Sequence, residues 1–190
     1  MEFIREHIEA FSVLTDSDWL YFSSRLVQRN FKKRTVILRH NEVEDHISFI
    51  GEGVVRLYIP HELKEKEVTF GFSFKNQFIS AYDSFLTRTP SLYELETLSE
   101  TTLYSISYKD LQDVYDNTQF GNLIGRLTSE RLFLLKSKRE QSLLNETAEQ
   151  RYFKLFKERP ELLNVIPLKY VSSYIGVTPQ ALSRIRKRIN

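Results

Sequence analysis

Residues 168–190 of this 190-residue chain, LKYVSSYIGVTPQALSRIRKRIN, constrain the fold more than any other stretch. Counted from the first of these residues, apolar side chains stand at positions 1, 4, 8, 10, 15 and 18, with a glycine at position 9. This spacing predicts two short helices that face each other, over 168–175 and 179–189, and Gly176 supplies the turn. Thr178 before Pro179 is typical of a helix start. The stretch therefore predicts a helix-turn-helix.

The same stretch is strongly basic, unlike the chain as a whole. The whole chain has 27 Lys and Arg against 25 Asp and Glu, whereas this stretch has basic residues and no acidic one. The outward face of the second helix would hold Gln180, Ser183, Arg184 and Lys187. Gln can pair with adenine and Arg with guanine in the major groove. Double-stranded DNA is the expected partner, with phosphate contacts from three further residues, Lys169, Arg186 and Arg188. The alternative is a solvated basic end on an unrelated helical pair.

Composition excludes several classes of protein. The chain is 41% apolar with 14 Phe and 10 Tyr, which is enough for a packed core. It has no cysteine, which excludes disulfides, cysteine-ligated zinc and Cys-ligated iron–sulfur clusters. No apolar run is long enough to span a membrane, and the charged start MEFIREHIEAF is unlike a signal peptide. We expect a cytoplasmic protein with no membrane partner and no cofactor.

The N-terminal part changes from helix to strand. Residues from Met1 to about Val27 are helical in pattern, with a helix start at Thr15. Beyond Phe31, segments rich in Val, Ile, Thr, Tyr and Phe follow each other closely, as in an antiparallel β-sandwich or barrel. Residues 50–54 (IGEGV) predict a tight hairpin, and residues 60–67 (PHELKEKE) a charged turn between two strands.

The alternation of strand residues fails between Phe74 and Tyr93. Residues 78–86 predict a short helix or an irregular loop that ends at Pro90. Such an interruption often lines a pocket, and the alternative is a plain connection. The candidate effector pocket comprises Phe72, Phe74, Phe78, Ser80, Ala81, Tyr82 and Phe85, with Thr128 and Ser129 from the helix that follows.

A long helix is expected from about Thr118 to Leu144, after a short one over 108–115. Its length of about 40 Å at 1.5 Å per residue exceeds what a domain of this size easily covers. A modest coiled-coil seam supports dimerisation, and the alternative is a helix packed within one subunit. The apolar seam residues are Phe120, Leu123, Leu127, Leu134 and Leu144. Thr147 and Gln150 predict a capping box for the next helix, after a hinge at Asn145-Glu146.

The predicted fold class is α+β. An N-terminal antiparallel β-roll, jelly-roll-like with flanking helices, would be followed by a long dimerisation helix and a C-terminal helix-turn-helix. The expected domains are a β-roll sensor domain over 1–117, the dimerisation helix and hinge over 118–145, and a DNA-binding domain over 146–190.

This order of parts resembles the Crp/Fnr superfamily of transcription regulators across essentially the whole chain, and its C-terminal motif is similar to Crp-like proteins of the Bacteroidetes. The most specific matches are VSSYIGVTPQALSRIRKRI, ISFIGEGVVRLY and TAEQRY. The resemblance implies a regulator, not an enzyme, that binds a twofold-symmetric DNA site as a homodimer and is controlled through its N-terminal domain. It implies that Gln180, Ser183 and Arg184 read base edges and that Thr178, beside Pro179, touches phosphate. RNA polymerase is a further candidate partner.

Two departures from the family pattern matter. Cyclic-nucleotide-binding members carry a Gly-Glu pair and then an arginine for the cyclic phosphate, whereas here Ser80-Ala81 stands at the first place and no arginine lies in residues 90–94. Arg88 precedes this window. Losing such a contact costs about 2–3 kcal/mol or more, so we expect that cyclic AMP is not the effector, whose identity stays open. The resemblance also implies a helix-turn-helix of winged-helix type. The second departure is the short segment 159–167, which predicts that this wing is reduced or absent.

Other functions fit less well. A ligand-binding β-barrel whose C-terminal helices mediate protein–protein interaction is the main alternative. A cupin-type enzyme would need a His/Glu cluster on adjacent strands, and His46 with Glu52 lacks a second nearby histidine. The four histidines are scattered without the spacing of a metal or haem site.

Overall fold

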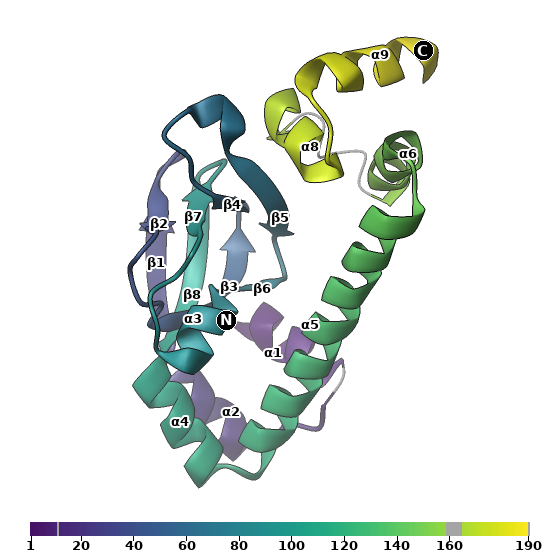
Figure 1. Cartoon of the computed structure of the whole chain (residues 1–190). Coiled ribbons are helices and arrows are strands. Elements are labelled where there is room, and N and C mark those ends of the chain that lie inside the picture. Colours follow the sequence, from purple (N-terminus) through teal and green to yellow (C-terminus); the bar gives the residue numbers. More distant parts are fainter. Residues whose placement is uncertain (11, 159–164, 190) are drawn as a thin grey trace.

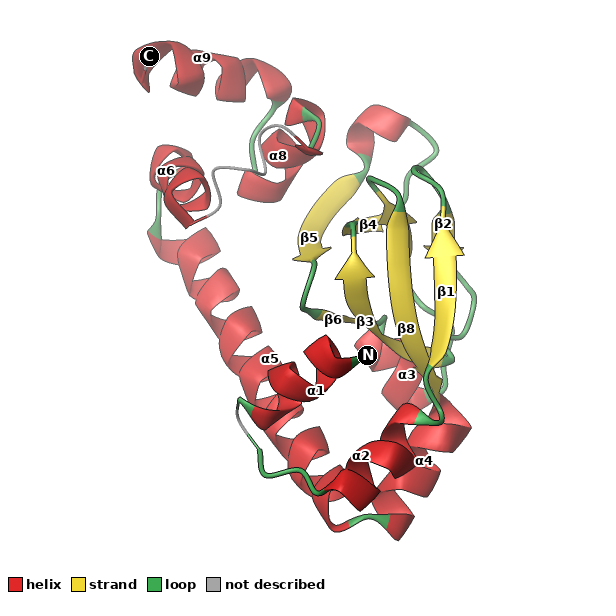
Figure 2. Ribbon diagram, turned by 180° about the vertical axis from the view of Figure 1, so that it is seen from behind, coloured by secondary structure: helices red, strands yellow, loops and turns green. Residues whose placement is uncertain are grey.

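The computed structural model describes residues 1–10, 12–158 and 165–189. Its centre is a pair of four-stranded antiparallel sheets (Figures 1 and 2). In order across the first sheet, the strands are β1 (Val27–Phe31), β8 (Thr101–Ser107), β3 (His46–Glu52) and β6 (Phe78–Ile79). Across the second sheet they are β2 (Val36–Leu38), β7 (Glu94–Thr97), β4 (Val54–Ile59) and β5 (Val68–Phe74). The α+β class and the antiparallel β-roll are confirmed.

The chain changes sheets at Gly53. Strand β3 pairs with β6 and β8, while β4 pairs with β5 and β7. The hairpin expected at residues 50–54 is therefore wrong, because the turn joins strands of different sheets. Gly53 has φ 102°, and a Cβ there would lie 2.4 Å from Thr101 Oγ1. Only glycine fits this corner. The turn expected at residues 60–67 does join paired strands, β4 and β5, through the 3₁₀ turn η1 (Lys64–Lys66).

Helices close one end of the first sheet. These are α1 (Glu2–Glu9), α2 (Asp16–Ser23), α4 (Tyr108–Asn117) and the start of α5 (Gln119–Asn145). As expected, Thr15 caps α2 by accepting the Asp18 N–H at 3.1 Å. One apolar cluster joins these helices to the sheet, and a second fills the space between the sheets. The second cluster contains Leu38, Ile50, Val55, Leu57, Ile79, Leu95 and Leu103.

The interruption near residue 80 forms β6 and then the short helix α3 (Tyr82–Thr87), which ends at Arg88 in the left-handed conformation. Helix α5 is the longest element and runs from α4 to α6 (Figure 1). Helix α6 (Ala148–Glu158) begins with the predicted capping box, since the Thr147 N–H donates to Gln150 Oε1 at 2.8 Å and the Gln150 N–H to Thr147 Oγ1 at 3.2 Å. Among the described residues, no helix is both long and apolar enough to cross a membrane.

The C-terminal helices are α8 (Leu168–Ile175) and α9 (Pro179–Ile189), with the predicted bounds. Their apolar cluster includes Tyr152 of α6 and also reaches Val54 and Phe72 of the second sheet. In both views α8 lies between β5 and α6, and α9 lies on the side away from the sheets (Figures 1 and 2). The reduced wing was expected over 159–167, of which 159–164 lie outside the described residues.

Candidate nucleic-acid interface

The turn between α8 and α9 has the geometry that the sequence predicts. Gly176 ends α8 with φ 80°, and its N–H donates to the carbonyl oxygens of Ser172 and Ser173. Thr178 Oγ1 accepts the N–H of Ala181 at 3.2 Å, which satisfies one of the free donors at the start of α9. The side chains between the two helices are buried, namely Val171, Ser172, Ile175, Leu182 and Ile185.

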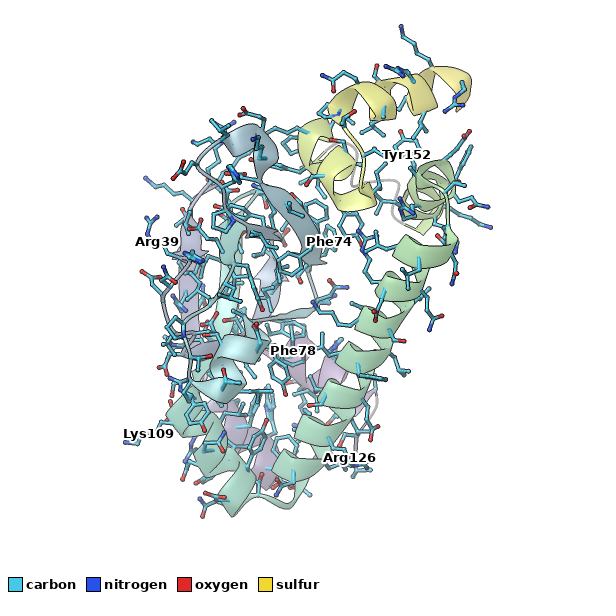
Figure 3. All side chains as sticks on the ribbon, viewed as in Figure 1. Arg39, Phe74, Phe78, Lys109, Arg126 and Tyr152 are labelled. Carbon is cyan, nitrogen blue, oxygen red and sulfur yellow. The ribbon has the colours of Figure 1, made fainter. Side chains whose placement is uncertain are left out.

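The opposite side of α9 faces solvent. Most of the residues proposed to contact DNA are exposed, namely Lys169, Thr178, Pro179, Gln180, Ser183, Arg184, Lys187 and Arg188. Arg186 differs, because it is half-buried and interacts with Tyr152 on α6. Figure 3 labels Tyr152 between α6 and the terminal helices. Arg188 lies 3.8 Å from a Glu149 carboxylate oxygen, so one of the proposed phosphate contacts has an internal partner.

Helix α5 carries the second proposed surface. Phe120 is buried within the helical cluster of its own chain, and Leu123 and Leu127 are half-buried. Leu134 and Leu144 are 66% and 77% exposed. Three further apolar side chains of this helix lie off the predicted seam and are also exposed, namely Phe133, Leu135 and Leu143. An exposed apolar surface of this kind on a helix usually marks an interaction site.

The proposed effector-pocket residues do not gather in one place. Phe72 and Phe74 pack against the cluster of α8 and α9, while Phe78, Tyr82 and Phe85 belong to the cluster with α1, α4 and α5. In Figure 3 Phe74 and Phe78 lie at different heights of the sheets. Ala81 is fully buried between the sheets. Thr128 is half-buried on α5.

Two polar contacts connect this region to its surroundings. The Ser80 hydroxyl donates to the His46 carbonyl at 2.9 Å. Tyr82 and Ser129 share a hydrogen bond of 2.9 Å, and Ser129 donates its own proton to the Gly125 carbonyl at 2.8 Å. Tyr82 is then the donor of the pair, and it ties α3 to α5.

Sequence reasoning missed Glu44, which lies beneath α3. Glu44 is 7% exposed, and its carboxylate accepts the N–H groups of His46 at 3.0 Å and Ala81 at 3.4 Å. Burial raises the pKa of the Glu44 carboxyl. Arg88 donates to the Glu44 carbonyl and to Asp45, each at 2.7 Å. A lone Glu in a loop gives no pattern that would reveal this role.

Sequence reasoning also missed Lys136. Its ammonium lies 5.2 Å from the centre of the Phe70 ring, and desolvation lowers its pKa although much of its surface remains exposed. Tyr93 packs edge-on against Phe70 at 4.9 Å and donates to Asp83 at 2.6 Å. Lys136 of α5 thus contacts Phe70 of β5, whose ring packs against Tyr93. Among the described residues, no three His, Asp or Glu side chains are grouped to hold a metal ion.

Residues 28–118 match the family model of the cyclic nucleotide-binding domain. Solved structures share the fold over nearly the whole chain. A c-di-GMP-responsive global regulator, CLP, of Xanthomonas campestris is 16% identical, with 92% of this chain and 91% of that one aligned and a TM-score of 0.69. FixK2 of Bradyrhizobium japonicum is 13% identical, over 86% and 84%, with a TM-score of 0.73.

A protein of Eubacterium rectale, described as a transcriptional regulator of the crp/fnr family, is 15% identical over 93% of this chain and 83% of that one, with a TM-score of 0.73. No curated protein matches the chain in sequence.

Proposed function

We propose that the chain, which has the fold of the Crp/Fnr transcription regulators and matches the cyclic nucleotide-binding domain over residues 28–118, binds a twofold-symmetric DNA site as a homodimer through α9. In this proposal residues 1–117 form a sensor-type domain, 118–145 the dimerisation helix and hinge, and 146–190 the DNA-binding domain.

The observation that carries the proposal is the outward face of α9. Gln180, Ser183 and Arg184 are exposed near the start of a helix whose other face is buried on α8. The N-terminal residues of a recognition helix are those that reach base edges in the major groove. Arg184 is suited to a guanine and Gln180 to an adenine, while Lys187 and Lys169 are suited to phosphates.

The exposed surface of α5 supports the homodimer. Leu134 and Leu144 have little cover within one chain, and a second copy of α5 would remove them from water. Two copies of α9 held by one dimer would then contact two half-sites related by the same twofold axis.

The structure around α3 favours a regulator that does not respond to cyclic AMP. The Ala81 N–H already donates to the Glu44 carboxylate, and the guanidinium of Arg88 is held by Asp45 and the Glu44 carbonyl. Ser91 is buried and donates to the Tyr93 carbonyl at 2.8 Å. A cyclic phosphate would find its donors here engaged by the protein itself.

Selection of bound sites from random DNA, followed by fluorescence anisotropy, tests the function. We expect a twofold site, and we expect Arg184→Ala to weaken binding to it by about 1–3 kcal/mol, the cost of one lost base contact. Binding to random DNA should fall less. Lys109→Ala is the matched control, because Lys109 is an exposed base on α4, far from α9 (Figure 3).

Salt provides a second criterion. If basic side chains of the terminal helices meet phosphates, the logarithm of the binding constant must fall linearly and steeply with the logarithm of the salt concentration. Weak binding to every duplex together with an Arg184→Ala variant like the wild type would contradict the proposal. That result would favour the protein–protein interaction role for the terminal helices.

A further inference from the structure

Helix α8 packs against the β-sheets through a stripe that is separate from the face holding α9. Tyr170, Ser173 and Tyr174 are three and four residues apart and therefore share one side of the helix. Val171 and Ile175 lie on the other side, in the cluster with α6 and α9. The helix is thus held between the DNA-binding unit and strand β5.

Ser173 covers the edge of the second sheet. Strand β5 is the last strand of that sheet, so one row of its backbone groups has no strand partner. The Thr69 N–H donates to Ser173 Oγ at 2.8 Å, and the Ser173 hydroxyl donates to the Glu67 carbonyl at 3.2 Å. One side chain of α8 therefore satisfies both a donor and an acceptor of the sheet edge.

Arg56 of β4 forms the centre of this contact. Arg56 is 1% exposed, and its guanidinium donates to Thr69 at 2.9 Å, to Glu67 at 3.0 Å and to Glu96 at 3.3 Å. One face of the group stacks on Tyr58 and another on Tyr170 of α8, with 4.0 and 3.7 Å to the ring centres. Tyr170 covers a charge that would otherwise meet solvent.

Tyr174 joins three parts of the chain. Its ring lies 5.2 Å from that of Phe72 on β5 and 4.0 Å from the guanidinium of Arg139 on α5. Arg139 also donates to the Tyr174 carbonyl, and Arg151 of α6 donates to the Ile175 carbonyl at 2.8 Å. The end of α8 is held from β5, α5 and α6 together.

We propose that this docking contact, of Tyr170, Ser173 and Tyr174 with Arg56, Thr69 and Phe72, determines the spacing of the two DNA half-sites that the dimer accepts. The inference rests on the proposed function. Docking fixes α9 relative to α5, and α5 carries the dimer surface. The two recognition helices of a dimer are then held at one separation along the duplex and at one rotational position around its axis.

The alternative to docking is a terminal unit joined to α5 only near Asn145. Such a unit would sample many orientations, and its dimer would tolerate several spacings with a lower gain from binding both half-sites. The docked position leaves Gln180, Ser183 and Arg184 exposed, so docking and DNA binding are compatible.

The test compares DNA duplexes that carry the selected half-sites at their selected spacing and with inserted base pairs. An insertion of about 5 base pairs turns one half-site to the opposite side of the helix. Two full-length variants weaken the contact from opposite sides, Tyr170→Ala on α8 and Phe72→Ala on β5. Phe72 lies in the sheet, so its variant leaves the helix-turn-helix sequence intact. Tyr104→Ala, which removes a half-buried ring of the other sheet, is the control.

For the wild type and the control we expect the insertion to weaken binding by about 100-fold, the lower range of the gain from bivalent engagement. For both docking variants we expect weaker binding at the selected spacing and a penalty below about 10-fold for the insertion. Docking variants that keep the full wild-type penalty would overturn the inference.

Hydrogen exchange of the DNA-free dimer adds a measurement that needs no DNA. Because the Thr69 N–H donates to Ser173 Oγ, Ser173→Ala should exchange faster than wild type in a peptide covering residues 67–72, and unchanged exchange would count against docking. If the wild type binds all duplexes alike, the proposed function fails and the spacing inference fails with it. If the wild type has a spacing preference and the variants retain it, only the docking role is refuted.

Discussion

The guanidinium of Arg56 lies 3.7 Å from the centre of the Tyr170 ring, so a fully buried cation of strand β4 is covered by the first helix of the helix-turn-helix. The same guanidinium pairs with Glu67 and Glu96. This relationship connects the stability of the sheets to the position of α8 and α9.

Replacing Arg56 by Met should lower the free energy of unfolding by about 3–5 kcal/mol, because the two carboxylates would remain poorly exposed and unpaired. Denaturant unfolding of the full chain measures this value. Lys75→Met is the matched control, since Lys75 forms an exposed ion pair with Glu52, and such pairs contribute about 1 kcal/mol or less. Equal losses in the two variants would show that the Arg56 network does not stabilise the fold.

Leu134→Asp on α5 should dissociate the proposed dimer. Leu134 is 66% exposed in one chain, and burial of a leucine contributes about 1.5–3 kcal/mol per copy, so the two copies predict a dissociation constant at least about 100-fold higher. Sedimentation equilibrium measures the change. Leu92→Asp, at a leucine that is equally exposed but lies beyond α3, should keep the wild-type oligomeric state. A Leu134→Asp chain that sediments like wild type would place the dimer surface elsewhere.

Glu44 should make the stability depend on pH. Burial raises its pKa in the folded chain, so the folded state binds the proton more tightly than the unfolded state does. The contribution of Glu44 to the free energy of unfolding is therefore most favourable below the ordinary pKa of Glu. It decreases as the pH rises through the raised pKa of Glu44 in the folded chain. Glu44→Gln, whose amide oxygen can still accept the Ala81 N–H, should gain stability relative to wild type as pH rises from about 4 to about 8.

Denaturant unfolding at several pH values gives this difference between the two proteins. Glu100→Gln, at an exposed turn, serves as the control. A wild-type minus Glu44→Gln difference that stays constant over the range would mean that Glu44 titrates alike in the folded and unfolded chains.

Isothermal titration with cyclic AMP and with cyclic GMP should show no saturable heat at micromolar ligand. The expected place of the Gly-Glu pair is Ser80-Ala81, where Ser80 donates to His46 and the Ala81 N–H to Glu44. A tight, saturable signal would contradict this interpretation of α3 and its neighbours.

The sequence by itself determined the helix bounds and caps of the C-terminal region. Thr147 and Gln150 cap α6, and Gly176 and Thr178 form the turn before α9, as their spacing predicts. Such signals act between residues that are at most four apart, so they do not depend on the rest of the fold. The inward and outward sides of α9 follow in the same way from helical periodicity.

Only the tertiary structure decided which distant side chains meet. It assigned β3 and β4 to different sheets at Gly53, separated Phe72 from Phe78, and brought Arg56 to Tyr170. Strand patterns predict which residues alternate along a strand, but they contain no information on which strand or helix packs beside it. The partners of Arg56 and Glu44 were therefore hidden in the sequence, because each depends on the packing of whole sheets and helices rather than on residues nearby in the chain.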